Sequence, residues 1–108
     1  MIVMHSLFDL IESCTVTEFQ QSVNLFTQHL KEKDLLISSR FMCNEPHDGY
    51  NADGPSTTYY LAIEFIDMSQ AEACWAYVES DDELVKSLHD RVKSSVRNSS
   101  FFLYRDIL

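Results

Sequence analysis

The spacing of apolar residues along the chain predicts strands that alternate with helices. From Ile2 to Leu10 apolar and polar residues alternate imperfectly at the two-residue period of a β-strand. From Val16 the apolar residues recur every three or four positions, which predicts a helix of about four turns. That stripe consists of Val16, Phe19, Val23, Phe26 and Leu30. The later apolar runs predict strands over 35–42, 59–66 and 101–108, a helix over 69–79 and a further helical segment over 81–96.

Two helix-start signals fix the order of these elements. Thr15 is followed by Glu18, and Ser69 is followed at the same spacing by Glu72. In such a pair the hydroxyl accepts from the backbone N–H three residues later and the Glu reaches back, so both pairs predict helix N-termini. The order β-α-β-β-α-α-β is the plan of the split-βαβ, or ferredoxin-like, sandwich. We therefore expect an α+β fold with a four-stranded antiparallel sheet, in a single domain over residues 1–108.

The segment 44–57 contains both prolines and both glycines and predicts a long hairpin loop. Loops of this length are more often functional than merely connective. Its His, Cys and acidic residues match the spacing of no known metal cage, so no metal site is predicted.

The predicted strands are too apolar for a sheet that is covered on one face only, because along the strands of such a sheet apolar and polar residues alternate cleanly. The predicted strand at 59–66 carries Leu61, Ile63 and Phe65 on one side and Tyr60, Ala62 and Ile66 on the other. Leaving roughly a few hundred Å² of apolar surface in water costs several kcal/mol at ~25 cal/mol per Å². A second copy of the chain is the simplest cover, since identical patches meet about a two-fold axis. We expect a homodimer.

Composition narrows the class of partner and the compartment. The 108 residues include 17 acidic and 8 basic side chains, and the net charge of −9 disfavours binding to nucleic acid or to an anionic membrane. Cys14, Cys43 and Cys74 fit neither a disulfide framework nor a zinc site and favour a reducing, cytoplasmic compartment. Residues 1–13 lack the basic and apolar regions of a signal peptide.

The passage from Leu61 to Asp67, the broken second helix and the aromatic last strand resemble the dimeric α/β-barrel superfamily. The resemblance implies a homodimer in which two sheets close face to face into an eight-stranded α/β barrel. Within this superfamily, Leu88-His89 and the Leu-Tyr-Arg-Asp ending at 103–106 resemble an uncharacterised bacterial family. The wider superfamily includes cofactor-independent monooxygenases, haem-degrading enzymes, muconolactone isomerase-like enzymes and stress-induced proteins, so the resemblance implies no single reaction. Its haem-binding members ligate iron with a helical histidine, and no residue here aligns with that ligand; no cofactor is expected.

Two histidines are the candidate catalytic residues. His89 matches the Leu-His pair of the resembled family and can act as a base or ligand, while its spacing from Leu88 and Val92 equally fits a packing residue. His5 lies on the less apolar side of the first strand with Asp9. It faces either the barrel interior or the pocket between sheet and helices.

The candidate ligand-binding residues are Tyr60, Trp75, His89, Tyr104 and Arg105. Aromatic residues at these spacings are typical of a core, and they also suit an apolar pocket that has a few polar anchors. Glu64, Arg40 and Arg105 lie inside apolar runs and need partners there. We expect Glu64 to meet an arginine in or beside the barrel and thereby to set the register of the two copies.

These observations leave three hypotheses of function. The first is a barrel that binds a small apolar or aromatic molecule in the cleft between sheet and helices. The second is a cofactor-independent monooxygenase-like or isomerase-like enzyme that uses His89 or His5 as base and Tyr104 or Tyr60 as orienting donor. The third is a purely structural or stress-related dimer.

Overall fold

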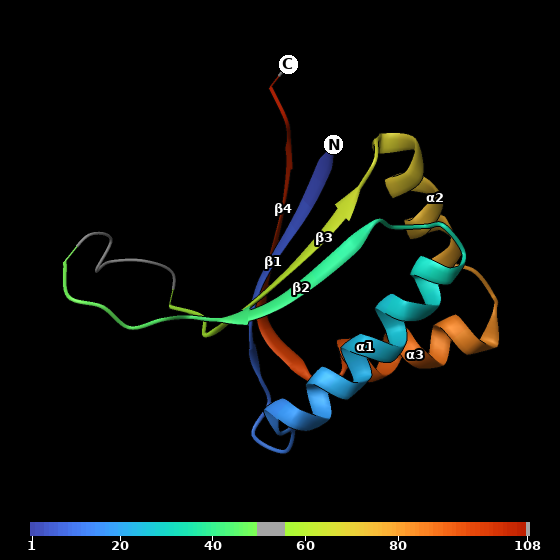
Figure 1. Ribbon diagram of the computed structural model, residues 1–108. Coiled ribbons are helices and arrows are strands. Elements are labelled where there is room, and N and C mark those ends of the chain that lie inside the picture. The colour runs from blue at the N-terminus through green and yellow to red at the C-terminus, as the bar shows by residue number, and fades with distance from the viewer. Residues whose placement is uncertain (50–55, 108) are drawn as a thin grey trace.

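The computed structural model describes residues 1–49 and 56–107, in which three helices cover one face of a four-stranded antiparallel sheet (Figure 1). The strands have the spatial order β2-β3-β1-β4. The elements are β1 (Ile2–Leu10), α1 (Val16–Glu32), β2 (Ser38–Cys43), β3 (Tyr59–Phe65), α2 (Met68–Val78), α3 (Glu83–Lys93) and β4 (Val96–Arg105). This order confirms the predicted ferredoxin-like α+β fold. Positions 50–55 of the predicted loop and position 108 of the predicted last strand lie outside the described residues.

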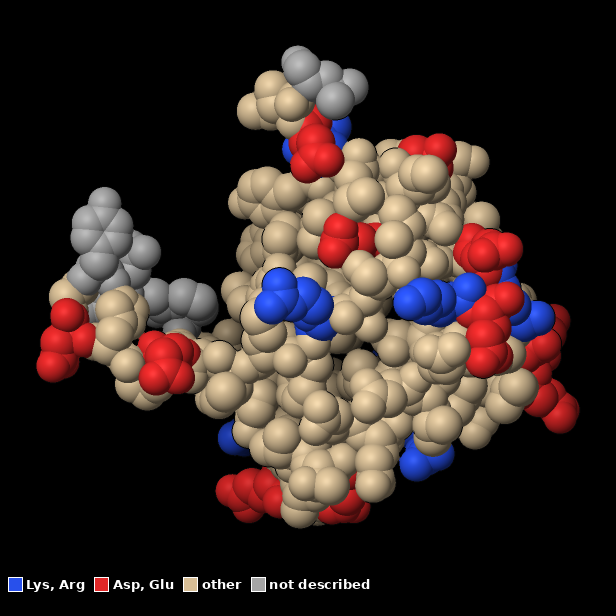
Figure 2. Space-filling view, in the orientation of Figure 1, with Lys and Arg blue, Asp and Glu red and all other residues tan. Residues whose placement is uncertain are grey.

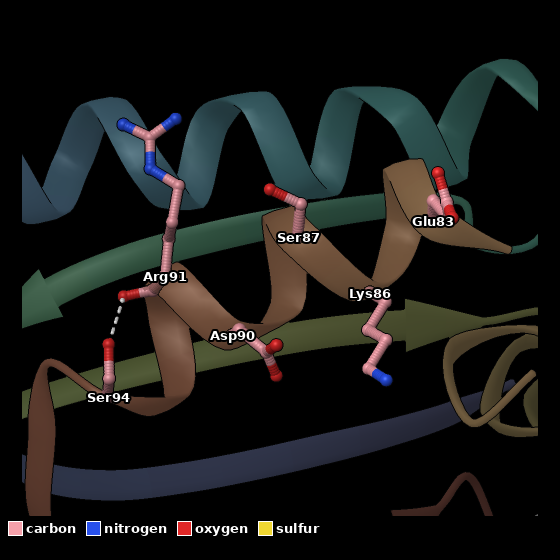
Figure 3. A pocket seen from close by; sticks show the side chains of 6 residues that line it. All are labelled: Glu83, Lys86, Ser87, Asp90, Arg91 and Ser94. Carbon is pink, nitrogen blue, oxygen red and sulfur yellow. Dashed lines mark hydrogen bonds between the residues drawn. The ribbon is translucent and has the colours of Figure 1, made fainter. Parts of the chain in front are cut away.

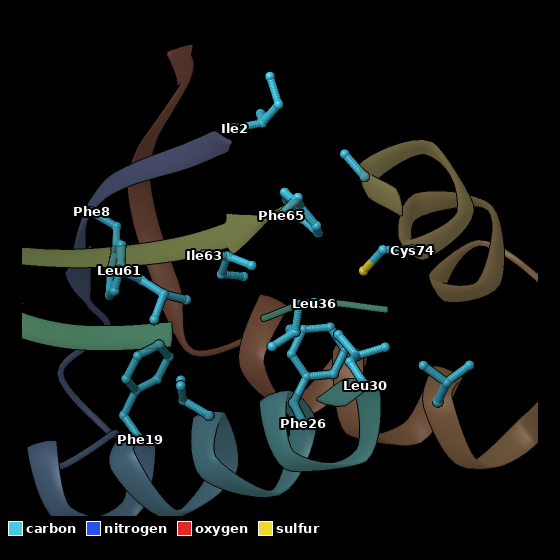
Figure 4. Packing of buried hydrophobic residues seen from close by; sticks show 13 residues of the cluster. Ile2, Phe8, Phe19, Phe26, Leu30, Leu36, Leu61, Ile63, Phe65 and Cys74 are labelled. Atoms are coloured by element: carbon cyan, nitrogen blue, oxygen red, sulfur yellow. The ribbon is translucent and has the colours of Figure 1, made fainter. Parts of the chain in front are cut away.

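The hydrophobic core lies between the sheet and the helices (Figure 4). The side chains that point from the sheet toward the helices include Phe8, Leu61, Ile63 and Phe65, and each is at most 6% exposed. Phe19 of α1 packs against Phe8 with ring centroids 5.3 Å apart. Each such side chain contributes roughly 1.5–3 kcal/mol by leaving water, so this layer is the main source of stability.

The first helix begins where the sequence predicts. The Thr15 hydroxyl accepts from the backbone N–H of Glu18, and the backbone N–H of Thr15 donates to the Glu18 carboxylate. The predicted capping box is therefore confirmed.

The second helix begins at Met68, and its cap is not the residue that the sequence predicts. Asp67 accepts from the backbone N–H of Gln70, whereas Ser69 lies inside the helix. The prediction of a capping box at Ser69 and Glu72 is wrong, because the carboxylate of Asp67 was available two residues earlier on an extended residue. The strand before it correspondingly ends at Phe65, and Ile66 is 61% exposed.

The boundary between the last helix and the last strand also differs from the prediction. The helix ends at Lys93, and β4 begins at Val96, which lies opposite Leu10 of β1. Asn98 lies within β4 at φ 57°, where the pairing with β1 shifts register. Its side chain donates to Asp9 at 3.1 Å. The strand thus starts five residues before its apolar run.

In the view of Figure 2 most charged side chains lie over the helices and at the margins, while a basic and an acidic side chain lie over the strands amid uncharged surface. No helix within the described ranges is long and apolar enough to cross a membrane.

Candidate functional site

The face of the sheet that points away from the helices carries three of the six predicted site residues, namely His5, Tyr60 and Tyr104. We call it the open face. It holds Val3, His5 and Leu7 of β1, Ser38, Arg40 and Met42 of β2, Tyr60, Ala62 and Glu64 of β3, and Ser100, Phe102 and Tyr104 of β4. No helix covers this face in Figure 1, and Phe102 and Tyr104 are 47% and 65% exposed. A large apolar and aromatic surface therefore remains uncovered in the single chain.

Three aromatic side chains meet at the centre of the open face. His5 Nδ1 and the Tyr60 hydroxyl form a hydrogen bond between neighbouring strands. The ring of Tyr104 meets His5 edge to face at 5.1 Å. Burial raises the pKa of Tyr60, and the positive charge of Arg40 partly opposes that rise. Tyr60 is therefore a neutral hydroxyl at physiological pH that both donates and accepts.

The register places a small residue among four large polar ones. Ala62 lies opposite His5 on one side and Arg40 on the other, and Tyr60 and Glu64 precede and follow it on the same face of β3. Ala62 is only 8% exposed, so these larger neighbours cover most of it on this face.

Two of these four neighbours of Ala62, Arg40 and Glu64, carry charge. Glu64 accepts a hydrogen bond from Ser38 at 2.9 Å. The ion pairs recorded among residues 1–49 and 56–107 involve neither Glu64 nor Arg40. The predicted contact between Glu64 and an arginine is thus not made inside the protomer.

His89 lies on the other side of the sheet, away from His5. It stacks on Phe26 of α1 at 5.4 Å and is half-buried between α1 and α3. Burial lowers the pKa of His89, and the nearby Lys93 lowers it further. This environment is that of a neutral packing residue, one of the two alternatives that the sequence left open.

The other two predicted ligand residues also lie apart from the open face. Trp75 of α2 packs edge to face on Phe65 at 6.1 Å, next to the core. Arg105 lies opposite Ile2 in the register and points to the helix side of the edge strand. The five predicted ligand-binding residues therefore divide, and only Tyr60 and Tyr104 accompany His5.

The structure adds residues that sequence reasoning missed. Ser38 and Ala62 complete the surroundings of His5 and Tyr60, and nothing in their local sequence distinguishes them from other strand residues. On the helix side, His29 Nε2 and the Tyr77 hydroxyl lie 2.8 Å apart and tie α1 to α2. Burial raises the pKa of the Cys74 thiol to about 11, which keeps it protonated and unreactive.

In the part of the chain that the structure describes, surface hollows lie on α3 and beside α1. One of about 570 Å³ lies on α3, where Lys86 and Arg91 project beside Glu83 and Asp90 (Figure 3). Its side chains are exposed and of both signs, as is usual for the solvated face of a helix. Two further hollows flank α1, and none of the three linings includes a predicted catalytic or ligand-binding residue.

The fold is shared with solved structures of low sequence identity. SnoaB, a cofactor-independent oxygenase from Streptomyces nogalater, has a TM-score of 0.71 and 8% identity, over 97% of this chain and 91% of that one. The protein At3g17210 from Arabidopsis thaliana has a TM-score of 0.77 and 6% identity, over 100% and 97%. A dimeric ferredoxin-like protein of unknown function from Jannaschia sp. CCS1 has a TM-score of 0.69 and 12% identity, over 97% and 98%. These likenesses confirm the ferredoxin-like fold.

One family matches the chain at the level of sequence. The model of the "Family of unknown function (DUF6614)" matches residues 1–107. No protein of curated function matches the chain.

Proposed function

The chain belongs to DUF6614, a family of unknown function, and we propose that it forms a homodimer through the open face and binds a small aromatic molecule there. The observation that carries this proposal is the hydrogen bond between His5 and Tyr60 on an uncovered, largely apolar face. A polar pair of this kind is the usual anchor of an otherwise apolar binding site. The protein from Jannaschia, which shares the fold and is described as dimeric, supports the homodimer.

The ligand is placed on the open face because core side chains occupy the space between sheet and helices. The sequence alone predicted a ligand in that space. Phe19, Phe65 and Leu30 fill it and are at most 1% exposed. Tyr104 and Phe102 supply aromatic surface on the open face instead, and the second copy closes the site from above. The three free thiols support our further proposal that the protein works in a reducing, cytoplasmic compartment.

Thermal unfolding with matched ligands tests the binding proposal. The probes are 2-naphthol and its methyl ether 2-methoxynaphthalene, which has the same rings but no hydroxyl to donate. We expect 2-naphthol to raise Tm more than the ether does. Tyr60→Phe and His5→Gln should lose that difference, whereas His89→Gln, which alters a histidine on the other side of the sheet, should keep it. Equal stabilisation of all four proteins, or none by any aromatic compound in a wider screen, would contradict the proposal.

A second candidate function is a cofactor-independent oxygenase or isomerase. An imidazole in contact with a hydroxyl is the arrangement of a general base and an orienting donor, and SnoaB, which shares the fold, is named a cofactor-independent oxygenase. An oxygen electrode distinguishes this candidate from simple binding. Enzymatic function predicts uptake of oxygen, or isomerisation followed by absorbance, that needs no added cofactor and is lost in His5→Gln.

A further inference from the structure

Arg40 and Glu64 stand out on the open face because neither finds an opposite charge. They lie on neighbouring strands, β2 and β3, and their backbone positions differ by one row of the register: Arg40 is opposite Ala62, and Ser38 is opposite Glu64. Ser38 donates to Oε1 of Glu64, and the hydrogen bonds recorded among the described residues leave Oε2 without a donor. The guanidinium of Arg40 likewise has no recorded carboxylate partner within the described ranges.

The other acid of this face is already satisfied. Asp9, at the far end of β1, accepts from the backbone N–H of Thr58 at 2.9 Å and from the side chain of Asn98 at 3.1 Å. Both contacts lower the pKa of Asp9. Arg97 lies opposite Asp9 in the register, and its positive charge also lowers the pKa of Asp9. Asp9 and Arg97 therefore compensate each other. Arg40 and Glu64 are the charges of the open face that still need partners.

When a second copy covers the open face, Arg40 and Glu64 must meet opposite charges within the interface. A charge that is moved from water into an interface is costly unless an opposite charge meets it there. Two copies that meet face to face are related by a two-fold axis that lies in the interface. An axis that crosses the line between Arg40 and Glu64 at its midpoint and at a right angle carries Arg40 of one copy to the position opposite Glu64 of the other. Such an axis brings Arg40 of one copy opposite Glu64 of the second copy, and the reverse, so one axis makes two ion pairs.

We infer that Arg40 and Glu64 form reciprocal ion pairs across the two-fold axis of a homodimer and thereby fix the register in which two open faces meet. The occupant of the open face is a second copy of this chain, because the surface offers one cation and one free anion in a self-complementary arrangement. Much of the remaining surface of the face is apolar or aromatic, and such surface selects one orientation less strongly than charges do. This inference rests on the proposed function and adds the contact that specifies the dimer.

Reversing the two charges, singly and together, tests the ion pairs by the recovery of the dimer as well as by its loss. Arg40→Glu places two acids in each half of the interface, and Glu64→Arg places two bases there. Each variant alone should have a dimer dissociation constant at least about 100-fold above that of the native protein, because like charges then face each other. An equimolar mixture of the two variants should form a heterodimer, since every acid again meets a base. The double variant with both exchanges should again form a homodimer.

Sedimentation velocity and native mass spectrometry measure these outcomes. Arg105→Glu is the matched control: it makes the same change of charge on β4 but points to the helix side, so it should leave the dimer intact. Recovery of a dimer in the mixture also shows that both single variants fold. If the single variants dimerise as well as the native protein, or if their mixture stays monomeric, the inference is overturned. A native protein that is itself monomeric overturns the proposed homodimer as well, and a native dimer with unaffected single variants overturns only the ion pairs.

Discussion

Replacement of Phe102 by serine should weaken the proposed dimer strongly. Phe102 lies next to His5 in the register, and 47% of it is exposed in the single chain. The accessible surface of a phenylalanine side chain is roughly 200 Å², so about 90 Å² per copy is exposed in the single chain and would be buried in the dimer. At ~25 cal/mol per Å² the substitution removes about 2.3 kcal/mol of dimerisation free energy per copy, and about 4.6 kcal/mol for the symmetric pair. That energy corresponds to a dissociation constant raised by roughly a thousandfold.

The neighbouring residue provides the control for this experiment. Phe101 is 64% exposed, more than Phe102, but it lies opposite the buried Ser6 and points to the helix side of β4. Phe101→Ser removes the same side chain from the same strand and should change the dissociation constant by less than about threefold, since it leaves the open face intact. Sedimentation equilibrium over a range of concentrations measures both constants. Equal weakening by the two substitutions, or none by Phe102→Ser, would refute the assignment of the open face as the interface.

Two further predictions concern the helix side of the protein. The lowered pKa of His89 means that, as the pH falls, the unfolded chain binds a proton before the folded chain does. The free energy of unfolding should therefore be full above about pH 6.5 and should decrease as the pH drops through that value. Thermal unfolding of His89→Gln should show a smaller decrease, and a variant with the same pH profile as the native protein would contradict this. Thr15→Ala should lower the free energy of unfolding by about 1 kcal/mol in urea titrations, because it removes the cap of α1, and a loss below about 0.3 kcal/mol would show that water replaces the cap.

Local patterns were sufficient to predict the element order and most of the core. The strand from Ile2 to Leu10 and the start of the first helix are observed where the alternation and the Thr15–Glu18 pair place them. Both signals act over a few residues, so the sequence displays them directly. The last strand was harder, because its first half is polar and is held by pairing with Leu10 and by the contact between Asn98 and Asp9, partners that lie far away in the chain.

The contacts of the candidate site were also hard to predict, because they join residues that lie far apart in the chain. His5 and Tyr60 are 55 positions apart, and their contact depends on the register of two strands. The sequence named both residues, and one hypothesis joined them as base and orienting donor. The predicted ligand-binding set, however, grouped Tyr60 with His89 and Trp75, which occupy the other side of the sheet. A shift of register by one residue exchanges the two faces of a strand, so assignment of a side chain to a face requires the pairing itself. The surplus of apolar strand residues was visible without the register, and it led to the prediction of a homodimer.

The mass of the protein in solution tests the central claim most directly. Sedimentation equilibrium of the native chain at micromolar concentration should give twice the protomer mass of 12.5 kDa. A stable species of 12.5 kDa, which binds no second copy as the concentration is raised, would contradict the claim that the open face of the sheet is closed by another molecule of the same chain.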